Sequence, residues 1–317
     1  MELKTLVSEV SQCFYLWLPF STVERDVADF FEQNGDGEKF QAALVAEICE
    51  SQVAKCFPVH PDKSLKFVKA LIRVLERSGV EVSDELYDAL SSTPDQEVFY
   101  KSYFIDSVYV LSLGESVEMI SHGTAGLKTW QAAEALTHFL RSCSELVTGK
   151  SVLELGSGVG FTGISLVKLG LVDSIVLSDC HGRVLDKLRH NCRVNFAAFE
   201  EEESRGCLKL IGGSKEVKVV DIDWDTFSEN DLSSIEPECV IAADVVYDPS
   251  IVPSLVKTIA TCLARGAAFA LVACTPRNPE TLNRFLTSLR EQNLAVDERT
   301  SPILNPDGVL FYHITQK

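Results

Sequence analysis

A short apolar stretch that ends in three closely spaced glycines constrains the fold of this chain more than any other feature. Residues 152–155 read Val-Leu-Glu-Leu, and Gly156, Gly158 and Gly160 follow at alternate positions. Glycines there let the main chain turn sharply and approach a ligand, while the start of the next helix presents free N–H groups. The pattern predicts a buried strand, a ligand-binding turn and a helix, the opening unit of an α/β fold.

Strand-like and helix-like segments alternate from residue 151 onward. The expected strands are 151–155, 174–178, 217–220, 239–243, 267–273, 294–299 and 309–314, and the expected helices lie near 129–142, 161–169, 181–196, 250–264 and 279–292. Apolar strands that alternate with helices are typical of a Rossmann-like, mostly parallel sheet covered on both faces. Only residues 301–307 separate the last two strands, too few for a helical crossover, so we expect an antiparallel C-terminal edge.

The first hundred residues have a helical pattern instead. Apolar residues recur every three or four positions between Leu3 and Phe14, and further helices are expected over 39–50, 63–77 and 83–91. Ser21, three residues before Glu24, has the spacing of a helix-capping box. Aromatic and β-branched residues on both sides of Asp106-Ser107 predict a hairpin. We therefore expect a helical module over residues 1–97, a hairpin and connector over 98–128, and an α/β domain over 129–317.

The charge balance excludes several classes of partner. The chain has 317 residues, with 29 Lys and Arg against 46 Asp and Glu, a formal net charge of −17. Non-specific nucleic-acid binding requires the opposite balance, and no apolar run is long enough to cross a membrane. The ten cysteines contain no Cys-x-x-Cys pair, which indicates reduced thiols in a cytoplasmic protein without a bound metal. The acidic run from Glu200 to Glu203 is expected to be a solvated loop.

The glycine turn has two interpretations. Residues 158–163 also satisfy the dinucleotide pattern G-x-G-x-x-G, and Asp179 follows where a ribose-binding acid is expected. The turn begins earlier, however, at Gly156, and Glu154 places a carboxylate inside the strand. That carboxylate suits the ammonium group of an amino-acid-bearing cofactor better than a pyrophosphate. The residues favour such a cofactor, and an NAD(P)-dependent oxidoreductase is the alternative.

Several motifs together resemble one enzyme family. Residues 154–160 are similar to the first motif of the seven-β-strand, class I methyltransferases that use S-adenosyl-L-methionine (SAM), and Asp244-Val245-Val246-Tyr247 resembles the Asp-x-x-Tyr signature of their protein-lysine branch. Residues 126–133 match that branch too. Further stretches narrow the resemblance to the enzymes that methylate translation elongation factor 2: 84–90, 178–181, 221–225, 241–244 and 277–280.

The resemblance implies a seven-stranded sheet with a helical N-terminal module, SAM as the cofactor, and a lysine of elongation factor 2 as the acceptor in the cytoplasm. It also implies the cofactor contacts. Gly156, Ser157 and Gly158 would wrap the methionine part, Asp179 would accept both ribose hydroxyls, and Trp224 would cover the adenine. The main chain of Ala243 would pass close to the cofactor, and Trp130 would contact it.

Asp244 and Tyr247 follow the fourth strand of the expected sheet and are the candidate catalytic residues. We expect them to hold the end of the target lysine and polarise its N–H bonds, without a covalent intermediate. A methyltransferase of the same branch with another protein substrate, and an adaptor that binds SAM without transferring methyl groups, are further alternatives.

Overall fold

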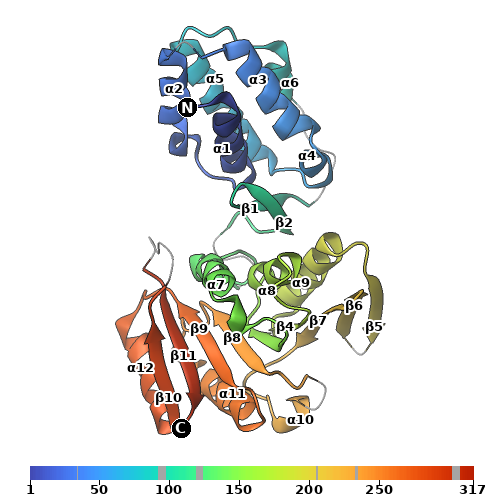
Figure 1. The fold of residues 1–317 in the computed structure, drawn as a ribbon, viewed down its shortest axis with the longest axis vertical. Helices are drawn as coiled ribbons and strands as arrows, with labels where there is room; N and C mark the ends of the chain where they lie inside the picture. Colours follow the sequence, from blue (N-terminus) through green and yellow to red (C-terminus); the bar gives the residue numbers. More distant parts are fainter. Residues whose placement is uncertain (34, 92–97, 119–123, 205, 233–234, 302–307) are drawn as a thin grey trace. The chain divides into compact units, whose positions relative to one another are not determined.

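The computed structural model describes the whole chain except residues 34, 92–97, 119–123, 205, 233–234 and 302–307. The described residues form two compact units, Met1–Glu115 and Ser116–Lys317 (Figure 1). The finer division into residues 1–97, 98–128 and 129–317 stays a prediction.

The first unit is built from helices around a core of its own. Leu6, Phe40, Leu71 and Leu75 are fully buried, because each helix turns one apolar stripe inward. The helices expected from the sequence are confirmed, although the one expected over residues 39–50 ends in a π-helical turn at Ala46–Glu50. The capping role of Ser21 is wrong, since Phe20–Thr22 forms a 3-10 turn and Val23 takes the N-cap. The helices are α1 (Leu3–Tyr15), α2 (Glu24–Glu32), α3 (Gly37–Val45), α4 (Gln52–Cys56), α5 (Pro61–Arg77) and α6 (Asp84–Ser91).

The predicted hairpin is also confirmed. Strands β1 (Tyr100–Ile105) and β2 (Val108–Gly114) pair in antiparallel register. Asp106 and Ser107 both have left-handed φ values, 50° and 61°, as a two-residue turn of type I′ requires.

The second unit contains a nine-stranded sheet within the described residues. Its order is β10-β11-β9-β8-β3-β4-β7-β6-β5, with parallel pairing from β9 through β8, β3 and β4 to β7. Strand β11 is antiparallel to both of its neighbours, which confirms the predicted antiparallel C-terminal edge. The strands are β3 (Ser151–Leu155), β4 (Ser174–Asp179), β5 (Glu200–Ser204), β6 (Cys207–Gly212), β7 (Lys215–Asp221), β8 (Cys239–Ala243), β9 (Phe269–Cys274), β10 (Leu294–Arg299) and β11 (Leu310–Gln316).

The acidic run at 200–203 corrects the expectation of a loop. It forms the edge strand β5, which pairs with β6 and adds two antiparallel strands to the seven that were expected. Its side chains are exposed, and Arg193 bridges Glu201 and Glu203, both at 2.8 Å. Pairing of the main chain and this shared cation offset the weak strand propensity of glutamate.

Helices cover both faces of the sheet (Figure 1). Leu153 and Leu155 of β3 join the apolar core on the face that carries α11 and α12, whereas Glu154 points to the opposite face, against α8. Helix α7 packs on α8, β8 and β9, and α9 packs on β4 and β7. The helices are α7 (Gln131–Ser142), α8 (Phe161–Lys168), α9 (Gly182–Asn195), α10 (Glu229–Leu232), α11 (Val252–Ala264) and α12 (Pro279–Glu291).

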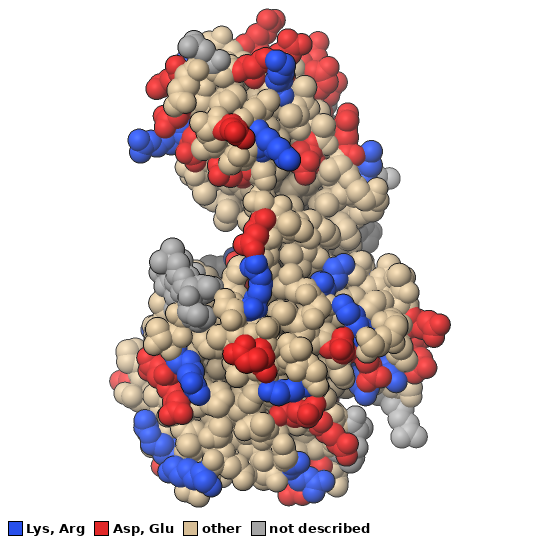
Figure 2. Space-filling view, in the orientation of Figure 1, with Lys and Arg blue, Asp and Glu red and all other residues tan. Residues whose placement is uncertain are grey.

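Charged side chains of both signs are mixed on one face of the molecule (Figure 2), and the cysteines are free thiols. On the face drawn in Figure 2, Lys and Arg side chains are scattered among Asp and Glu. All ten cysteines are described and none of them is in a disulfide. In the described part of the chain, no helix is both long and apolar enough to span a membrane, and no group of His, Cys, Asp and Glu has the arrangement of a metal site.

Candidate active site

A cavity of about 760 Å³ lies where the parallel strands β3, β4, β7 and β8 end. Strand β3 has β4 on one side and β8 on the other, so the strand order reverses there, and ligands of open α/β sheets bind at this point. All nine site residues expected from the sequence line this cavity: Trp130, Gly156, Ser157, Gly158, Asp179, Trp224, Ala243, Asp244 and Tyr247. The fold thus brings together residues that are up to 117 positions apart, from Trp130 to Tyr247.

The glycine turn after β3 forms one wall. Gly156 and Gly158 have left-handed φ values of 66° and 55°. A Cβ atom on Gly158 would lie 3.1 Å from the carbonyl oxygen of Gly126, and one on Gly156 would lie 2.8 Å from Val245. Glycine is therefore required twice, for the backbone conformation and for the close approach of neighbouring segments.

Ser157 fixes that turn to the neighbouring strand. Its N–H donates to the carbonyl oxygen of Ser178 at 2.8 Å, and its hydroxyl oxygen accepts from the N–H of Ser178 at 3.1 Å. The hydroxyl of Ser178 in turn donates to the carbonyl oxygen of Glu154 at 2.7 Å. The Ser157 side chain is thus engaged inside the fold, and this residue faces the cavity while holding β3 and β4 together.

Asp179 ends β4 and closes the turn from the other side. Its carboxylate accepts hydrogen bonds from the N–H groups of Gly158, Cys180 and His181, at 3.3, 2.9 and 3.1 Å. Burial raises the pKa of Asp179, and these backbone donors work against that rise. An acid held by three fixed donors is oriented before any ligand arrives.

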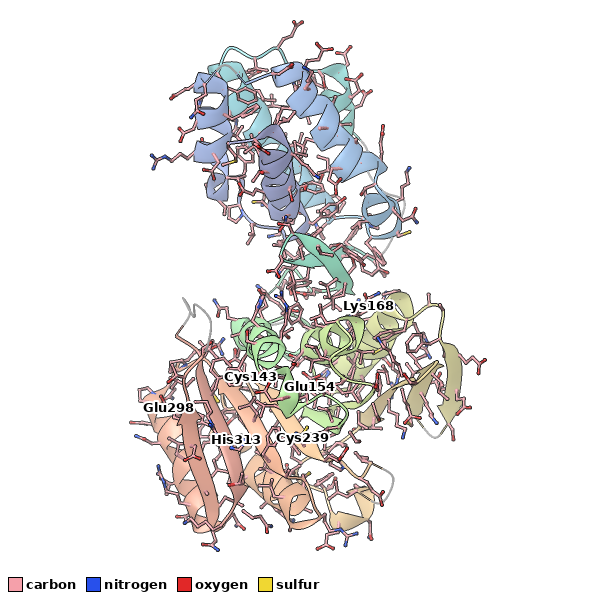
Figure 3. The ribbon with its side chains drawn as sticks, viewed as in Figure 1. Cys143, Glu154, Lys168, Cys239, Glu298 and His313 are labelled. Atoms are coloured by element: carbon pink, nitrogen blue, oxygen red, sulfur yellow. The ribbon has the colours of Figure 1, made fainter. Side chains whose placement is uncertain are left out.

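The environment of Glu154, which is labelled in Figure 3, indicates whether the cavity suits an amino-acid-bearing cofactor. The side chain lines the cavity and the residue is 2 % exposed, and its Oε2 has no hydrogen-bond partner among the described residues. Burial, with a smaller contribution from the Asp179 carboxylate, raises the pKa of Glu154 to about 7, while hydrogen bonds from Ser157, Thr162 and the Gly163 N–H act in the opposite direction. A buried acceptor oxygen without a donor, such as Oε2, is costly, and the ammonium group of a methionine moiety would supply both a donor and a compensating charge.

Two indole rings form further walls. Trp130 precedes α7, and its Nε1–H donates to the carbonyl oxygen of Ala125 at 3.0 Å, which fixes the ring. Trp224 follows β7 and packs against the core while remaining partly exposed to the cavity. Ala243 is the last residue of β8, where its small side chain leaves the cavity open. Flat apolar walls of this kind suit a purine ring.

Asp244 lies directly after β8 in a left-handed conformation, with φ of 54°. Its carboxylate accepts three hydrogen bonds: from the Thr275 N–H at 2.8 Å, from the Thr275 hydroxyl at 3.1 Å and from the Arg277 guanidinium at 2.9 Å. The Asp244 side chain is only 6 % exposed. The structure therefore places Asp244 at the cavity, with its charge already paired.

Tyr247 has the opposite environment. It is 62 % exposed, at the mouth of the cavity. Partial burial of the phenol, together with the Asp179 and Asp248 carboxylates, raises the pKa of Tyr247. The hydroxyl therefore keeps its proton at neutral pH and can donate or accept a hydrogen bond.

Arg277 is a cavity residue to which the sequence analysis gave no individual role. It follows β9, pairs with Asp244, and its guanidinium carbon lies 4.8 Å from the centre of the Trp130 ring. The sequence signal that could have found it is its position, because Arg277 follows β9 as Asp244 follows β8. Parallel neighbouring strands bring such residues to one edge of the sheet.

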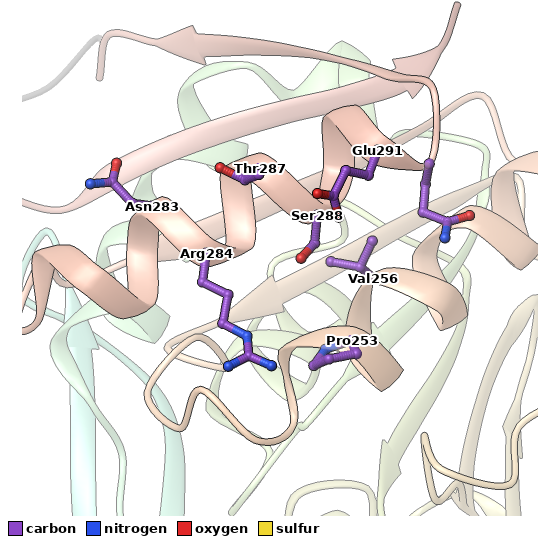
Figure 4. A pocket seen from close by; sticks show the side chains of 8 residues that line it. Pro253, Val256, Asn283, Arg284, Thr287, Ser288 and Glu291 are labelled. Carbon is purple, nitrogen blue, oxygen red and sulfur yellow. The ribbon is translucent and has the colours of Figure 1, made fainter.

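The cavity at the strand ends differs from a second cavity in the charge of its lining. Acidic side chains outnumber Lys and Arg around the cavity at the strand ends, which suits cationic ligands. The second, of about 500 Å³, lies between α11 and α12 and is lined by mixed polar side chains such as Asn283, Arg284 and Glu291 (Figure 4). It contains none of the predicted site residues, so the first cavity is the candidate active site.

A family model described as lysine methyltransferase matches residues 115–292, more than half of the chain. The chain therefore belongs to the lysine methyltransferase family, and SAM is its methyl donor. This assignment decides against the NAD(P)-dependent oxidoreductase that the glycine pattern had left as an alternative.

Curated relatives agree with the family. The human protein-lysine N-methyltransferase EEF2KMT is 39 % identical over 230 residues, covering 70 % of this chain and 68 % of that protein. Its counterpart from Bos taurus is 36 % identical over 292 residues, covering 88 % of this chain and 84 % of that protein. Among solved structures, Trm1 from Pyrococcus horikoshii in complex with SAM matches with a TM-score of 0.45 and 10 % identity, covering 65 % of this chain and 60 % of that chain.

Proposed function

We propose that this protein methylates a lysine of translation elongation factor 2, with SAM as the methyl donor, in the cytoplasm. One observation carries the proposal: a single cavity at the carboxyl ends of the parallel strands contains both the glycine turn and the Asp-x-x-Tyr residues. The choice of elongation factor 2 is supported by the stretches that resemble enzymes acting on it, and by relatives at 36–39 % identity that carry the name EEF2KMT.

The residues of the glycine wall would hold the cofactor. Gly156 and Gly158 would give close main-chain approach to its methionine part, and Ser157 would keep that wall in place. The carboxylate of Asp179 would accept from the ribose hydroxyls with the lone pairs that its backbone donors leave free. Trp130, Trp224 and Ala243 would enclose the remaining surface. When bound, the cofactor supplies an electrophilic methyl group on a positively charged sulfur.

The chemical difficulty lies in the acceptor. A free lysine has a pKa of about 10.4, so removing its proton near pH 7 costs about 4–5 kcal/mol. We propose that Asp244 and Tyr247 hold the end of the lysine side chain and orient its nitrogen lone pair, while the cavity walls exclude water. Alignment of the reacting atoms within about 3–3.5 Å then supplies much of the rate. No covalent intermediate with the protein is involved.

The test is methylation of purified, unmethylated elongation factor 2 with radiolabelled SAM, followed by mapping of the labelled residue. Labelled lysine in that protein is the expected result. Asp244→Ala and Tyr247→Phe should each reduce transfer while SAM still binds by calorimetry. Label in another protein of a cell extract, with none in elongation factor 2, would assign a different substrate within the family. Transfer near wild type by both variants would contradict the roles given to Asp244 and Tyr247.

A further inference from the structure

The pairing of Asp244 poses a chemical problem for lysine methylation. An isolated carboxylate beside a lysine stabilises the ammonium form, because an opposite charge nearby favours the charged state. The ammonium has no lone pair and cannot accept a methyl group. A bare Asp244 on the cavity wall would therefore bind the target lysine and, by the same interaction, keep it unreactive.

Arg277 resolves this problem in the structure. Its Nη2 lies 2.9 Å from Oδ2 of Asp244, and the same guanidinium rests on the face of Trp130 at 4.8 Å. The Arg277 side chain is 43 % exposed, whereas the Asp244 side chain that it contacts is 6 % exposed. A fixed cation thus accompanies the anion at the cavity wall.

We propose that Arg277 is a positioning residue of the methyl transfer: its guanidinium cancels the charge of Asp244, so that the target lysine occupies the site without its proton. The proton-loss step is simple. One N–H bond of the lysine ammonium breaks, its electron pair stays on nitrogen as the attacking lone pair, and the proton passes to bulk water. This inference rests on the proposed function and adds a residue outside the Asp-x-x-Tyr motif.

Two features separate this role from a merely structural one. Thr275 holds the Asp244 carboxylate through two further hydrogen bonds, and Ala125 holds the Trp130 ring through its carbonyl oxygen. Both partners of Arg277 are therefore anchored without it. Because the side chain is partly exposed, its replacement leaves no buried void.

When Arg277 is replaced by a neutral residue, the other ionisable groups near Asp244 do not provide a positive charge in its place. Cys274 ends β9, and its burial together with the Asp244 charge raises the pKa of its thiol, which stays neutral. Tyr247 is likewise neutral because its pKa is raised. Lys128, which lies before α7, is the other Lys or Arg side chain in the described lining.

Further along the same cavity, the acidic groups are Glu154 on β3, Asp179 after β4, and Asp223 and Asp225 after β7. Cys180 and His181 follow Asp179, and burial raises the pKa of Cys180. These groups are unchanged in any variant of Arg277, so a comparison with the wild type cancels their titration. They also add negative potential, which increases the need for a compensating cation beside the lysine.

The experiment compares single-turnover methylation of unmethylated elongation factor 2 at about pH 7 and about pH 9 in five proteins. Arg277→Gln and Arg277→Met remove the charge, and Arg277→Lys retains it. The matched control is Arg284→Gln, since Arg284 is an exposed arginine on α12 outside the cavity. SAM binding by calorimetry checks that each variant keeps an intact cofactor site.

We expect the methylation rate of both neutral variants to fall about tenfold or more at pH 7, because the lysine must then lose its proton unaided. At pH 9, where more of the lysine is neutral, their rates should recover to within about threefold of the wild type. Arg277→Lys and Arg284→Gln should stay within about threefold of the wild type at both pH values. Three results would each overturn this role: an equal loss of rate at both pH values in the neutral variants, no loss in those variants, or a loss at pH 7 with recovery at pH 9 in Arg277→Lys. Inactivity of all five proteins would instead overturn the proposed function.

Discussion

The buried carboxyl group of Glu154 gives the most quantitative prediction. It is 2 % exposed, and burial raises its pKa from 4.5 to about 7. The folded state thus binds this proton more tightly than the unfolded chain does. We consider the change Glu154→Gln, which keeps the shape of the side chain and removes the ionisable group.

The sign and size follow from proton linkage. Because the folded-state pKa is raised, the stability that this group contributes is fully present below about pH 4.5 and is lost as the pH rises through about 7. At about 1.4 kcal/mol for each pH unit, the rise from 4.5 to about 7 amounts to about 3 kcal/mol. The free energy of unfolding of the wild type, relative to Glu154→Gln, should therefore fall by about 3 kcal/mol between pH 4.5 and 7 and stay level above it.

The same group should make cofactor binding depend on pH. If the Glu154 carboxylate accepts from the ammonium group of SAM, only its ionised form binds well. The ionised fraction of a group with a pKa of about 7 rises about fivefold between about pH 6 and about pH 7, an interval in which the ammonium group stays mostly protonated. The Kd of the wild type for SAM should fall by a similar factor across that interval, and that of Glu154→Gln should stay nearly constant.

Chemical denaturation at a series of pH values measures the first effect, and isothermal titration calorimetry measures the second. Each quantity is taken as the difference between wild type and variant, because Asp179 in the same cavity also has a raised pKa. Parallel curves for the two proteins in either experiment would refute the placement of an uncompensated carboxyl group at Glu154.

Substitutions at Asp244, Gly163 and Trp224 test the site and the packing behind it. Asp244→Ala should lower the free energy of unfolding by about 2 kcal/mol, through three lost hydrogen bonds and an unfavourable left-handed φ, and Asp244→Asn by about half as much, both measured by denaturation. Gly163→Ala should cost about 1–3 kcal/mol because the new Cβ meets Leu177, whereas the control Gly182→Ala, in open space, should not destabilise; equal effects would contradict the packing. Trp224→Ala should weaken SAM binding about tenfold by calorimetry if the indole covers the adenine, and an unchanged Kd would exclude that contact.

The central sheet could be predicted because its strands carry a strong local signal. Residues 151–155 and 239–243, which are mostly apolar, were expected as strands with the bounds that the structure shows. Apolar β-branched runs next to turn residues bury both faces of a strand, and few other structures accommodate them. The glycine turn was equally predictable, since two of its positions exclude any side chain.

The edge strand β5 could not be predicted in the same way. A run of four glutamates has weak strand propensity, and its conformation depends on partners far along the chain. Pairing with β6 and the salt bridges to Arg193 of α9 are tertiary interactions that a local pattern does not contain.

The roles of the acidic side chains were only partly predictable. The sequence placed Asp244 after its strand, which the structure confirms, but not the three donors that occupy its carboxylate. Thr275 and Arg277 follow a different strand, and only the sheet order makes them neighbours of Asp244. Such pairing arises from topology, so spacing along the chain gives no direct measure of it.

The separate cores of the two units have a consequence for how this protein is handled. The apolar cluster of the first unit runs from Leu6 to Leu86, with Phe104 packed against it, and the cluster on the α11 and α12 face of the sheet runs from Leu153 to Ile314. A heating scan should accordingly resolve two melting events, of which SAM displaces only the one that belongs to the sheet. A single melting temperature would average the two events. A variant in which the first, helical unit is unfolded could still look intact in an assay that follows cofactor binding alone.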